Sequence, residues 1–336
     1  MHHRVRDWDN LPLELVEKIR DSLNLPGLFK FGRICSSWRS SSSHIFKTVI
    51  DSSLIIQKDS SHKGFIWIFS PSDGRPYQVQ LPYEYTSGKI WGFSKGWIVL
   101  EEDDNISDLQ LLHLFCSSSA SAIHLPPLPP FDDQGSDCRK VCLSSDQSMV
   151  MAIHRDLIKD RFNLYFCRPK QDSSWNVFTI PYWKQTTIVD VIFSSGMFYA
   201  ITFGGVFAVV DPSDGFKTTV IDAGTCFIWS YLAESSDHGV MVVNLATQSK
   251  SDGHWIEKID TSSSTDEAEV LSVINDIGDH AVFVSCHHSQ VISTNDFPYF
   301  KRNCVYTSAD PYWAWAGDVL YYDDRPVLLG GRSLDK

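Results

Sequence analysis

The sequence FIWIFSPSDGRPYQVQL, residues 65–81, consists of two β-prone runs on either side of a tight-turn signal. The same Pro-Ser-Asp-Gly turn recurs at residues 212–215, between an apolar run at 206–210 and a second run at 217–221. Asp-Gly is typical of hairpin turns because glycine adopts a positive φ without a steric penalty. The stretch therefore predicts an antiparallel hairpin that the chain uses more than once.

Weaker copies of this hairpin give the chain a long internal period. Equivalent positions lie about 44 to 51 residues apart, the period of a four-stranded propeller blade, at Phe65, Leu111, Phe162, Val206, Trp255 and Val305. A further apolar run falls between successive hairpins, at 96–100, 149–153, 197–201, 239–243 and 281–284.

This pattern predicts a mainly β fold, a β-propeller of about six blades of antiparallel strands over residues 63–330. A β-sandwich also places short strands between turns, and it stays open as an alternative. The nearly constant long period favours the closed ring.

A short helical pattern precedes the β region. Its apolar residues recur at helical spacing, first as Leu11, Leu15, Ile19 and Leu23, then as Leu28, Phe31 and Ile34. Pro12 suits the first turn of a helix, where its missing N–H needs no partner. We expect a small all-α module over residues 5–45, followed by a linker and first strand at 46–62. Because so short a module buries little surface alone, it needs the β domain or another protein as a neighbour.

The module resembles an F-box. That family's motif runs Leu-Pro-x-Glu-Leu, then a series of helical apolar positions, then Val-Cys-x-x-Trp. This sequence has Leu11-Pro12-x-Glu14-Leu15 at one end and Ile34-Cys35-x-x-Trp38-Arg39 at the other. It departs from the family at Ile34, which replaces Val, and at Gly27, where an acidic residue often precedes the second helix.

The resemblance implies binding to a Skp-type adaptor, which bridges to a cullin and a ubiquitin-conjugating enzyme. It also implies that seven residues divide between adaptor contact and the module's own core: Leu11, Pro12, Leu15, Ile19, Leu28, Phe31 and Trp38. Residues 60–325 resemble the poorly characterised C-terminal domain that follows the F-box in many plant F-box proteins, through segments such as 279–284 and 303–306.

The composition argues against several kinds of partner. The formal net charge is −12, whereas affinity for phosphate backbones and anionic membranes rests on Lys and Arg. We therefore expect no nucleic acid and no membrane as partners. The 8 cysteines include no Cys-x-x-Cys pair, which is typical of reduced thiols in an intracellular protein. We expect a location in the cytoplasm and/or the nucleus.

Candidate chemical groups are few. Residues 101–104, Glu-Glu-Asp-Asp, follow a predicted strand, which favours a solvated loop over a metal site. Cys286-His287-His288 has zinc-binding residue types, but neighbouring residues on a strand point to opposite faces. No P-loop, nucleophile elbow or dinucleotide fingerprint occurs in the sequence. We therefore expect no catalytic residue, no metal and no cofactor.

Aromatic residues in loops are the better guide to partners. Binding hot spots favour Trp, Tyr and Arg, and Trp183 and Trp313 lie in loop-like contexts. We predict these two residues as substrate contacts. Packing between blades is the alternative for each of them, as it is for Trp175.

On the F-box resemblance, we expect a non-catalytic substrate-recognition subunit of an SCF-type cullin ubiquitin ligase. The helices would bind the adaptor and the propeller an unknown protein substrate. Two alternatives stay open. One is a protein-interaction scaffold that uses the same helices without ubiquitination. The other is a propeller enzyme, which would require several groups around one channel, from among Asp190, Asp211, His238 and Glu257.

Overall fold

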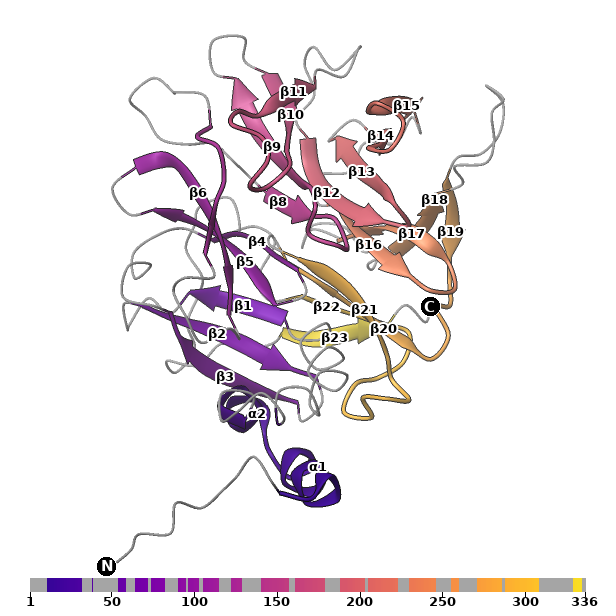
Figure 1. Cartoon of the computed structure of the whole chain (residues 1–336). Coiled ribbons are helices and arrows are strands. Elements are labelled where there is room, and N and C mark those ends of the chain that lie inside the picture. The colour runs from indigo at the N-terminus through magenta and orange to yellow at the C-terminus, as the bar shows by residue number, and fades with distance from the viewer. Residues whose placement is uncertain are drawn as a thin grey trace, which may run out of the picture.

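The computed structural model describes residues 11–31, 38, 54–58, 64–71, 74–81, 90–94, 96–102, 105–114, 122–128, 140–156, 161–178, 188–202, 205–222, 230–245, 255–259, 271–285, 288–307 and 329–333. In these ranges, helices α1 (Leu13–Asp21) and α2 (Leu25–Phe31) precede strands β1 to β23. The strands form six sheets around a common axis, five with four strands and one with three (Figure 1).

We number the sheets as blades in chain order. Blade 1 contains β1 (Leu54–Lys58), β2 (Phe65–Ser70) and β3 (Arg75–Gln80). Blade 2 contains β4 (Ile90–Ser94), β5 (Trp97–Glu102), β6 (Asn105–His113) and β7 (Ile123–His124). Blade 3 contains β8 (Lys140–Leu143), β9 (Val150–Asp156), β10 (Arg161–Cys167) and β11 (Asn176–Phe178). Blade 4 contains β12 (Ile188–Ser194), β13 (Met197–Thr202), β14 (Val206–Asp211) and β15 (Lys217–Asp222). Blade 5 contains β16 (Ser230–Ser235), β17 (Gly239–Asn244), β18 (Trp255–Ile259) and β19 (Leu271–Ile274). Blade 6 contains β20 (His280–Val284), β21 (Ser289–Ser293), β22 (Cys304–Thr307) and β23 (Leu329–Ser333).

The mainly β propeller predicted from the hairpin repeat is confirmed. The two Pro-Ser-Asp-Gly turns connect β2 to β3 and β14 to β15, and both strand pairs are antiparallel. Gly74 and Gly215 have φ values of 66° and 58° in these turns, a conformation that favours glycine. Five blades are complete four-stranded sheets, and blade 1 has three strands within the described residues.

The second strand of a blade is apolar almost throughout because both of its faces are buried. In β9, Met151 and Ile153 pack with residues of blade 4, whereas Val150 and Ala152 pack with residues of blade 2. Strands β13 and β17 alternate in the same way between their two neighbouring blades. Successive side chains on a strand point to opposite faces, so a strand between two neighbours needs an apolar residue at every position.

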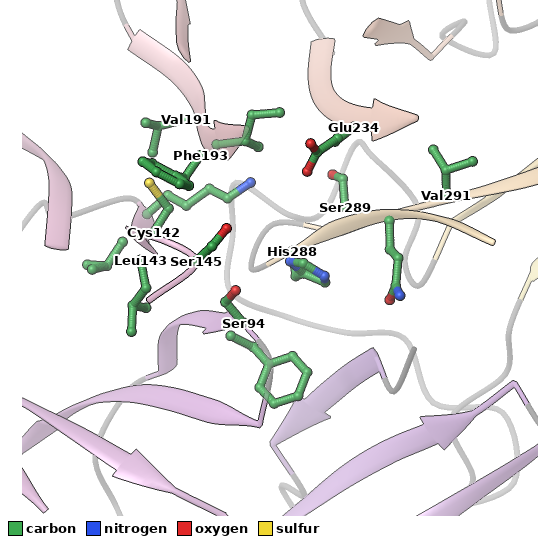
Figure 2. A pocket seen from close by; sticks show the side chains of 15 residues that line it. Ser94, Cys142, Leu143, Ser145, Val191, Phe193, Glu234, His288, Ser289 and Val291 are labelled. Atoms are coloured by element: carbon green, nitrogen blue, oxygen red, sulfur yellow. The ribbon is translucent and has the colours of Figure 1, made fainter. Parts of the chain in front are cut away.

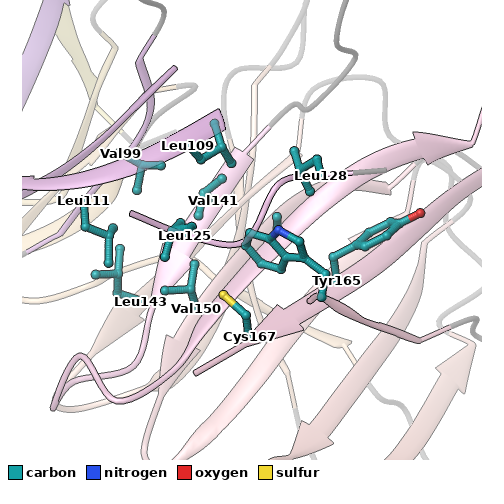
Figure 3. Packing of buried hydrophobic residues seen from close by; sticks show 12 residues of the cluster. Val99, Leu109, Leu111, Leu125, Leu128, Val141, Leu143, Val150, Tyr165 and Cys167 are labelled. Atoms are coloured by element: carbon teal, nitrogen blue, oxygen red, sulfur yellow. The ribbon is translucent and has the colours of Figure 1, made fainter. Parts of the chain in front are cut away.

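Buried apolar clusters join each blade to the next. Figure 3 shows the cluster between blades 2 and 3, in which Val99 and Leu111 of blade 2 meet Leu143 and Val150 of blade 3. Another cluster contains Phe69 of blade 1 and Phe283 of blade 6, whose ring centroids lie 6.3 Å apart. Since this last contact joins the first blade to the sixth, the clusters form a closed circuit.

Blade 6 departs from the antiparallel order that we predicted. Its strand order is β21-β20-β22-β23, and β20 pairs with β22 in parallel. A parallel pair requires the chain to return to the end from which it started. Strand β21 makes this return, and the segment that follows it crosses past the start of β20 to reach β22, where the Asn303 N–H donates to the His280 carbonyl at 2.8 Å.

The innermost strands of blades 3, 4 and 5 are joined by one carboxylate. Asp190 of β12 forms a buried ion pair with Lys140 of β8. Its other oxygen accepts a hydrogen bond from the backbone N–H of Leu232 in β16 at 2.7 Å. Asp190 is almost completely buried, and burying a charge is costly unless it is paired and hydrogen-bonded. Here both conditions are met by three blades together.

A first prediction concerns Gly92 of β4, next to blade 3. A Cβ atom at this residue would lie 2.0 Å from the carbonyl oxygen of Val141 in β8. Backbone atoms of an innermost strand cannot move aside cheaply, so Gly92→Ala should lower the free energy of unfolding by about 3 kcal/mol. Urea unfolding measures the change. Ser94→Ala, two residues along the same strand, is the control, and an equal loss in both variants would contradict the prediction.

A second prediction concerns the buried ion pair. Asp190→Asn leaves the Lys140 ammonium without its counter-charge and should lower the free energy of unfolding by about 3–5 kcal/mol. Adding Lys140→Met should recover part of this loss, because the remaining amide oxygen still accepts backbone hydrogen bonds. A double-mutant cycle of urea unfolding measures the coupling. Strictly additive losses would show that the two side chains do not stabilise the ring as a pair.

Candidate functional site

Helix α1 begins at the Leu-Pro pair that we identified in the sequence. Pro12 is its N-cap residue, and the Pro12 carbonyl accepts hydrogen bonds from the N–H groups of Leu15 and Val16 at 2.9 and 3.1 Å. The helix ends at Asp21, where the Ser22 hydroxyl donates to the carbonyl of Ile19 at 2.7 Å. Asp9 and Asn10, whose residue types often cap helices, lie outside the described residues.

Helix α2 begins with a side-chain cap. Asn24 precedes the helix, and its side-chain oxygen accepts a hydrogen bond from the N–H of Gly27 at 3.0 Å. Asn is among the best residues for this role. A Cβ atom at Gly27 would come within 3.1 Å of Asn24 and Leu23. The departure from the F-box motif at Gly27 therefore coincides with a capped helix start and a tight turn.

A small apolar core holds α1 and α2 together. Val16, Phe31 and Trp38 are buried, and the rings of Phe31 and Trp38 lie 4.6 Å apart between centroids. Leu11, Ile19 and Leu23 pack around this core and are half-buried. The sequence spacing indicated a stripe of every fourth residue, but the innermost α1 residue is Val16, which lies beside that stripe.

The seven residues selected by the F-box resemblance divide into two groups. Leu28, Phe31 and Trp38 are buried. Pro12 and Leu15 are exposed, the Leu15 side chain by 47%. Residues three or four positions apart on a helix lie on one face, so half-buried Leu11 and Ile19 flank Leu15. We call Leu11, Pro12, Leu15 and Ile19 the α1 docking face.

A second exposed leucine lies on the other side of the same helix. Leu13 is 60% exposed, and residues two positions apart on a helix do not face each other. Leu13 was not among the predicted site residues. It does not extend the α1 docking face, but it offers a matched comparison for Leu15.

The helices join the ring at the outer edge of blade 1. Helix α2 lies next to β3 (Figure 1), the third strand in the order β1-β2-β3. Pro76 lies in β3, and proline within sheets is confined mainly to edge strands because it lacks an N–H. An edge with unpaired backbone groups invites unwanted pairing. Within the described residues, helix α2 therefore lies against the outermost strand of blade 1.

Of the predicted aromatic contacts, Trp183 and Trp313 lie outside the described residues. Trp175, which we also considered, is buried between blades 2 and 3. Its indole N–H donates to the Pro126 carbonyl at 2.6 Å. For Trp175 the packing alternative is therefore correct.

The groups considered for chemistry are dispersed. Glu101, expected in a solvated loop, is buried in β5 and accepts a hydrogen bond from the Trp91 indole at 2.9 Å. Cys286 and His287 lie outside the described residues, and within the described part no three His, Cys, Asp or Glu side chains form a possible metal site.

The four residues considered for an enzyme channel lie in different elements of blades 4 and 5, and one of them, His238, lies in the turn between β16 and β17. Asp190 lies at the axis within its ion pair. Glu257 is buried in β18, where the Asn244 amide donates to it at 2.8 Å. Asp211 lies at the β14–β15 turn, where hydrogen bonds from Ser213 lower the pKa of its carboxyl group.

In the described residues, neither helix has the length and apolar character needed to cross a bilayer.

Comparisons with known proteins agree with the fold. Residues 68–324, more than half of the 336-residue chain, match the family model described as KIB1-4 beta-propeller. An F-box/kelch-repeat protein of Arabidopsis thaliana is 26% identical over 210 residues, which are 61% of this chain and 56% of that protein. The chain thus spans about half the length of this curated relative.

Solved structures with some likeness include two further proteins. The Cps50 (Swd1) beta-propeller domain of Myceliophteria thermophila matches at TM-score 0.38 and 10% identity, over 66% of this chain and 70% of that chain. Regucalcin, a calcium-binding protein of Agrobacterium tumefaciens, matches at TM-score 0.37 and 12% identity, over 59% of this chain and 64% of that chain. The family match runs from β2 past β22 and includes parts of all six blades, so this chain belongs to the KIB1-4 beta-propeller family.

Proposed function

We propose that this protein is the substrate-recognition subunit of an SCF-type cullin ubiquitin ligase. The α1 docking face would bind a Skp-type adaptor, which connects to the cullin, and the propeller would bind a protein substrate. The observation that carries the proposal is the exposure of Pro12 and Leu15 on a helix that Val16, Phe31 and Trp38 anchor to the rest of the module.

The division between buried and exposed residues supports this reading. Val16, which directly follows the Leu-Pro-x-Glu-Leu run, and Trp38, the last residue of Cys-x-x-Trp, meet in one small core with Phe31. A leucine with 47% of its side chain exposed still has apolar surface to bury against a partner. The relationship to a protein named F-box/kelch-repeat points to the same kind of partner.

The proposed role is non-catalytic. A recognition subunit accelerates ubiquitin transfer by holding the substrate near the conjugating enzyme, which is a contribution of proximity and orientation. The catalytic cysteines would belong to other subunits. Such a complex would work in the cytoplasm and/or the nucleus. A scaffold that binds the same adaptor without ubiquitination is the remaining alternative, since a propeller ring serves protein interaction in either case.

A third prediction tests the α1 docking face. Leu15→Ala in the full chain should weaken binding to a purified Skp-type adaptor about tenfold, because the buried part of one leucine is worth about 1.4 kcal/mol. Leu13→Ala is the matched control, since it removes an exposed leucine from the other side of α1 and should leave affinity within about twofold. Calorimetric titration measures both. No binding by a well-folded parent chain, or equal losses in the two variants, would overturn the proposal.

A fourth prediction distinguishes the core that holds α1 in place from the surface that contacts the adaptor. Phe31 is buried, so Phe31→Ala should abolish adaptor binding indirectly by removing the core that orients α1, at a local cost of about 3–5 kcal/mol. The propeller should keep its melting temperature, because blades 1 to 6 pack through other clusters. Hydrogen exchange of α1 amides, followed beside the thermal melt, measures both effects. Undisturbed exchange in α1 would show that Phe31 does not hold the helix in place.

A further inference from the structure

A cavity of about 250 Å³ lies at the axis of the ring. Its walls come from the innermost strands of blades 2 to 6, and Figure 2 shows Ser94, Ser145, Glu234, His288 and Ser289 around it. Phe93, Val191 and Phe193 add apolar surface. Pockets for drug-sized ligands measure about 300–1,000 Å³, so the size of this cavity suits a compact molecule.

The buried ion pair places a positive charge in the wall of the cavity. Lys140 lines the cavity, whereas Asp190 does not. The Asp190 oxygens are occupied by Lys140 and by the N–H groups of Val191 and Leu232, both at 2.7 Å. An ammonium group has three donors, and Asp190 accepts from one. The pair therefore presents its positive end to the cavity.

A buried hydroxyl group adds a donor to the same wall. Ser289 at the start of β21 is only 7% exposed. Its Oγ has no hydrogen-bond partner in the described structure, although buried hydroxyl groups are normally hydrogen-bonded. A ligand in the cavity that accepts a hydrogen bond would satisfy this group.

The remaining ionisable groups of the wall fix the sign of the ligand. Burial, and then the positive charge of Lys140, lower the pKa of His288 to about 3, so this ring is neutral at pH 7 and can donate one N–H. Among the described lining residues, Glu234 is the carboxylate; it is exposed, and the Ser194 hydroxyl donates to it at 2.7 Å. Its negative charge is therefore partly screened by solvent.

We propose that the axial cavity binds a compact molecule bearing one carboxylate, with Lys140 and Ser289 as hydrogen-bond donors to it. The ligand carboxylate would accept hydrogen bonds from the Lys140 ammonium and the Ser289 hydroxyl, and His288 supplies a further N–H in the same wall. Glu234 disfavours a second carboxylate on the same ligand. This site is separate from the α1 docking face and does not depend on the proposed ligase role.

The test uses the purified full chain with acetate, propionate and succinate as probes, and chloride as the control anion. The two monocarboxylates should raise the melting temperature in a saturable manner, beyond succinate and beyond chloride at equal ionic strength. The bound anion should also raise the pKa of His288, because a neighbouring negative charge favours the protonated ring. The ring-proton NMR signal of His288, assigned with His288→Gln, reports this change.

Two variants locate the binding. Ser289→Ala removes one donor to a charged acceptor and should weaken acetate binding about tenfold, whereas Ser236→Ala, an exposed serine on the β16–β17 turn, should not change it. Glu234→Gln should tighten binding, since it removes the opposing charge while keeping an acceptor for Ser194. These variants leave the Lys140–Asp190 pair intact, so the ring should still fold.

Each outcome decides the proposal. Saturable monocarboxylate binding that responds to Ser289→Ala and shifts the His288 signal supports it. Equal effects of acetate and chloride, with an unmoved His288 signal, overturn it and leave a cavity that holds water only. If a C-terminally amidated tetrapeptide containing one Asp binds where acetate does not, the small-molecule proposal is wrong and the carboxylate comes from a partner protein.

Discussion

The fold depends on one constraint, namely that each blade must bury both faces of its sheet at once. A sheet packed on one side shows alternating apolar and polar residues, whereas a sheet packed on both sides shows continuous apolar runs. The run Val150-Met151-Ala152-Ile153 has this second form, and its residues divide between two clusters. The same division links every blade to two neighbours. Closure of the ring follows, because a terminal blade would otherwise expose an apolar face.

At the axis of the ring, the strands need small side chains and partners for polar backbone groups. Innermost strands converge there, so large side chains do not fit at every position, and polar backbone groups lie close together. Gly92 has no side chain and therefore leaves space at the axis for the Val141 carbonyl. The Asp190 carboxylate satisfies one of these backbone groups, because it accepts a hydrogen bond from the Leu232 N–H. It also neutralises the charge of Lys140. The apolar clusters thus supply most of the burial, while these polar contacts fix the positions of the innermost strands of adjacent blades.

The repeat was readable from the sequence because its signals are local. Asp-Gly turns and strand-length runs lie within single hairpins, and the predicted propeller followed from the regular spacing at which these hairpins recur. The pairing of Lys140 with Asp190 joins residues 50 positions apart, and no local pattern connects the two. A charged residue inside an apolar run, as in Ile188-Val189-Asp190-Val191, indicates that a buried partner is needed but not which residue supplies it. Similarly, the parallel pairing of β20 and β22 depends on the chain passing from β21 across the start of β20, which no local pattern indicates.

In the helical module, too, local sequence patterns did not determine every contact. Spacing identified the correct apolar residues of α1, but Leu15 and Val16 are neighbours, and the periodicity alone did not decide which one faces inward. Phe31 and Trp38 follow α1 in the sequence and pack against Val16. This contact places Val16, and not Leu15, in the core. Leu15 is consequently left with exposed apolar surface, whose burial would be favourable. Helix α1 packs on its own module through Val16 and is connected through α2 to β3 of blade 1. Under the proposed role, a partner that buried Leu15 would therefore bind beside blade 1, on the same chain as any ligand of the ring.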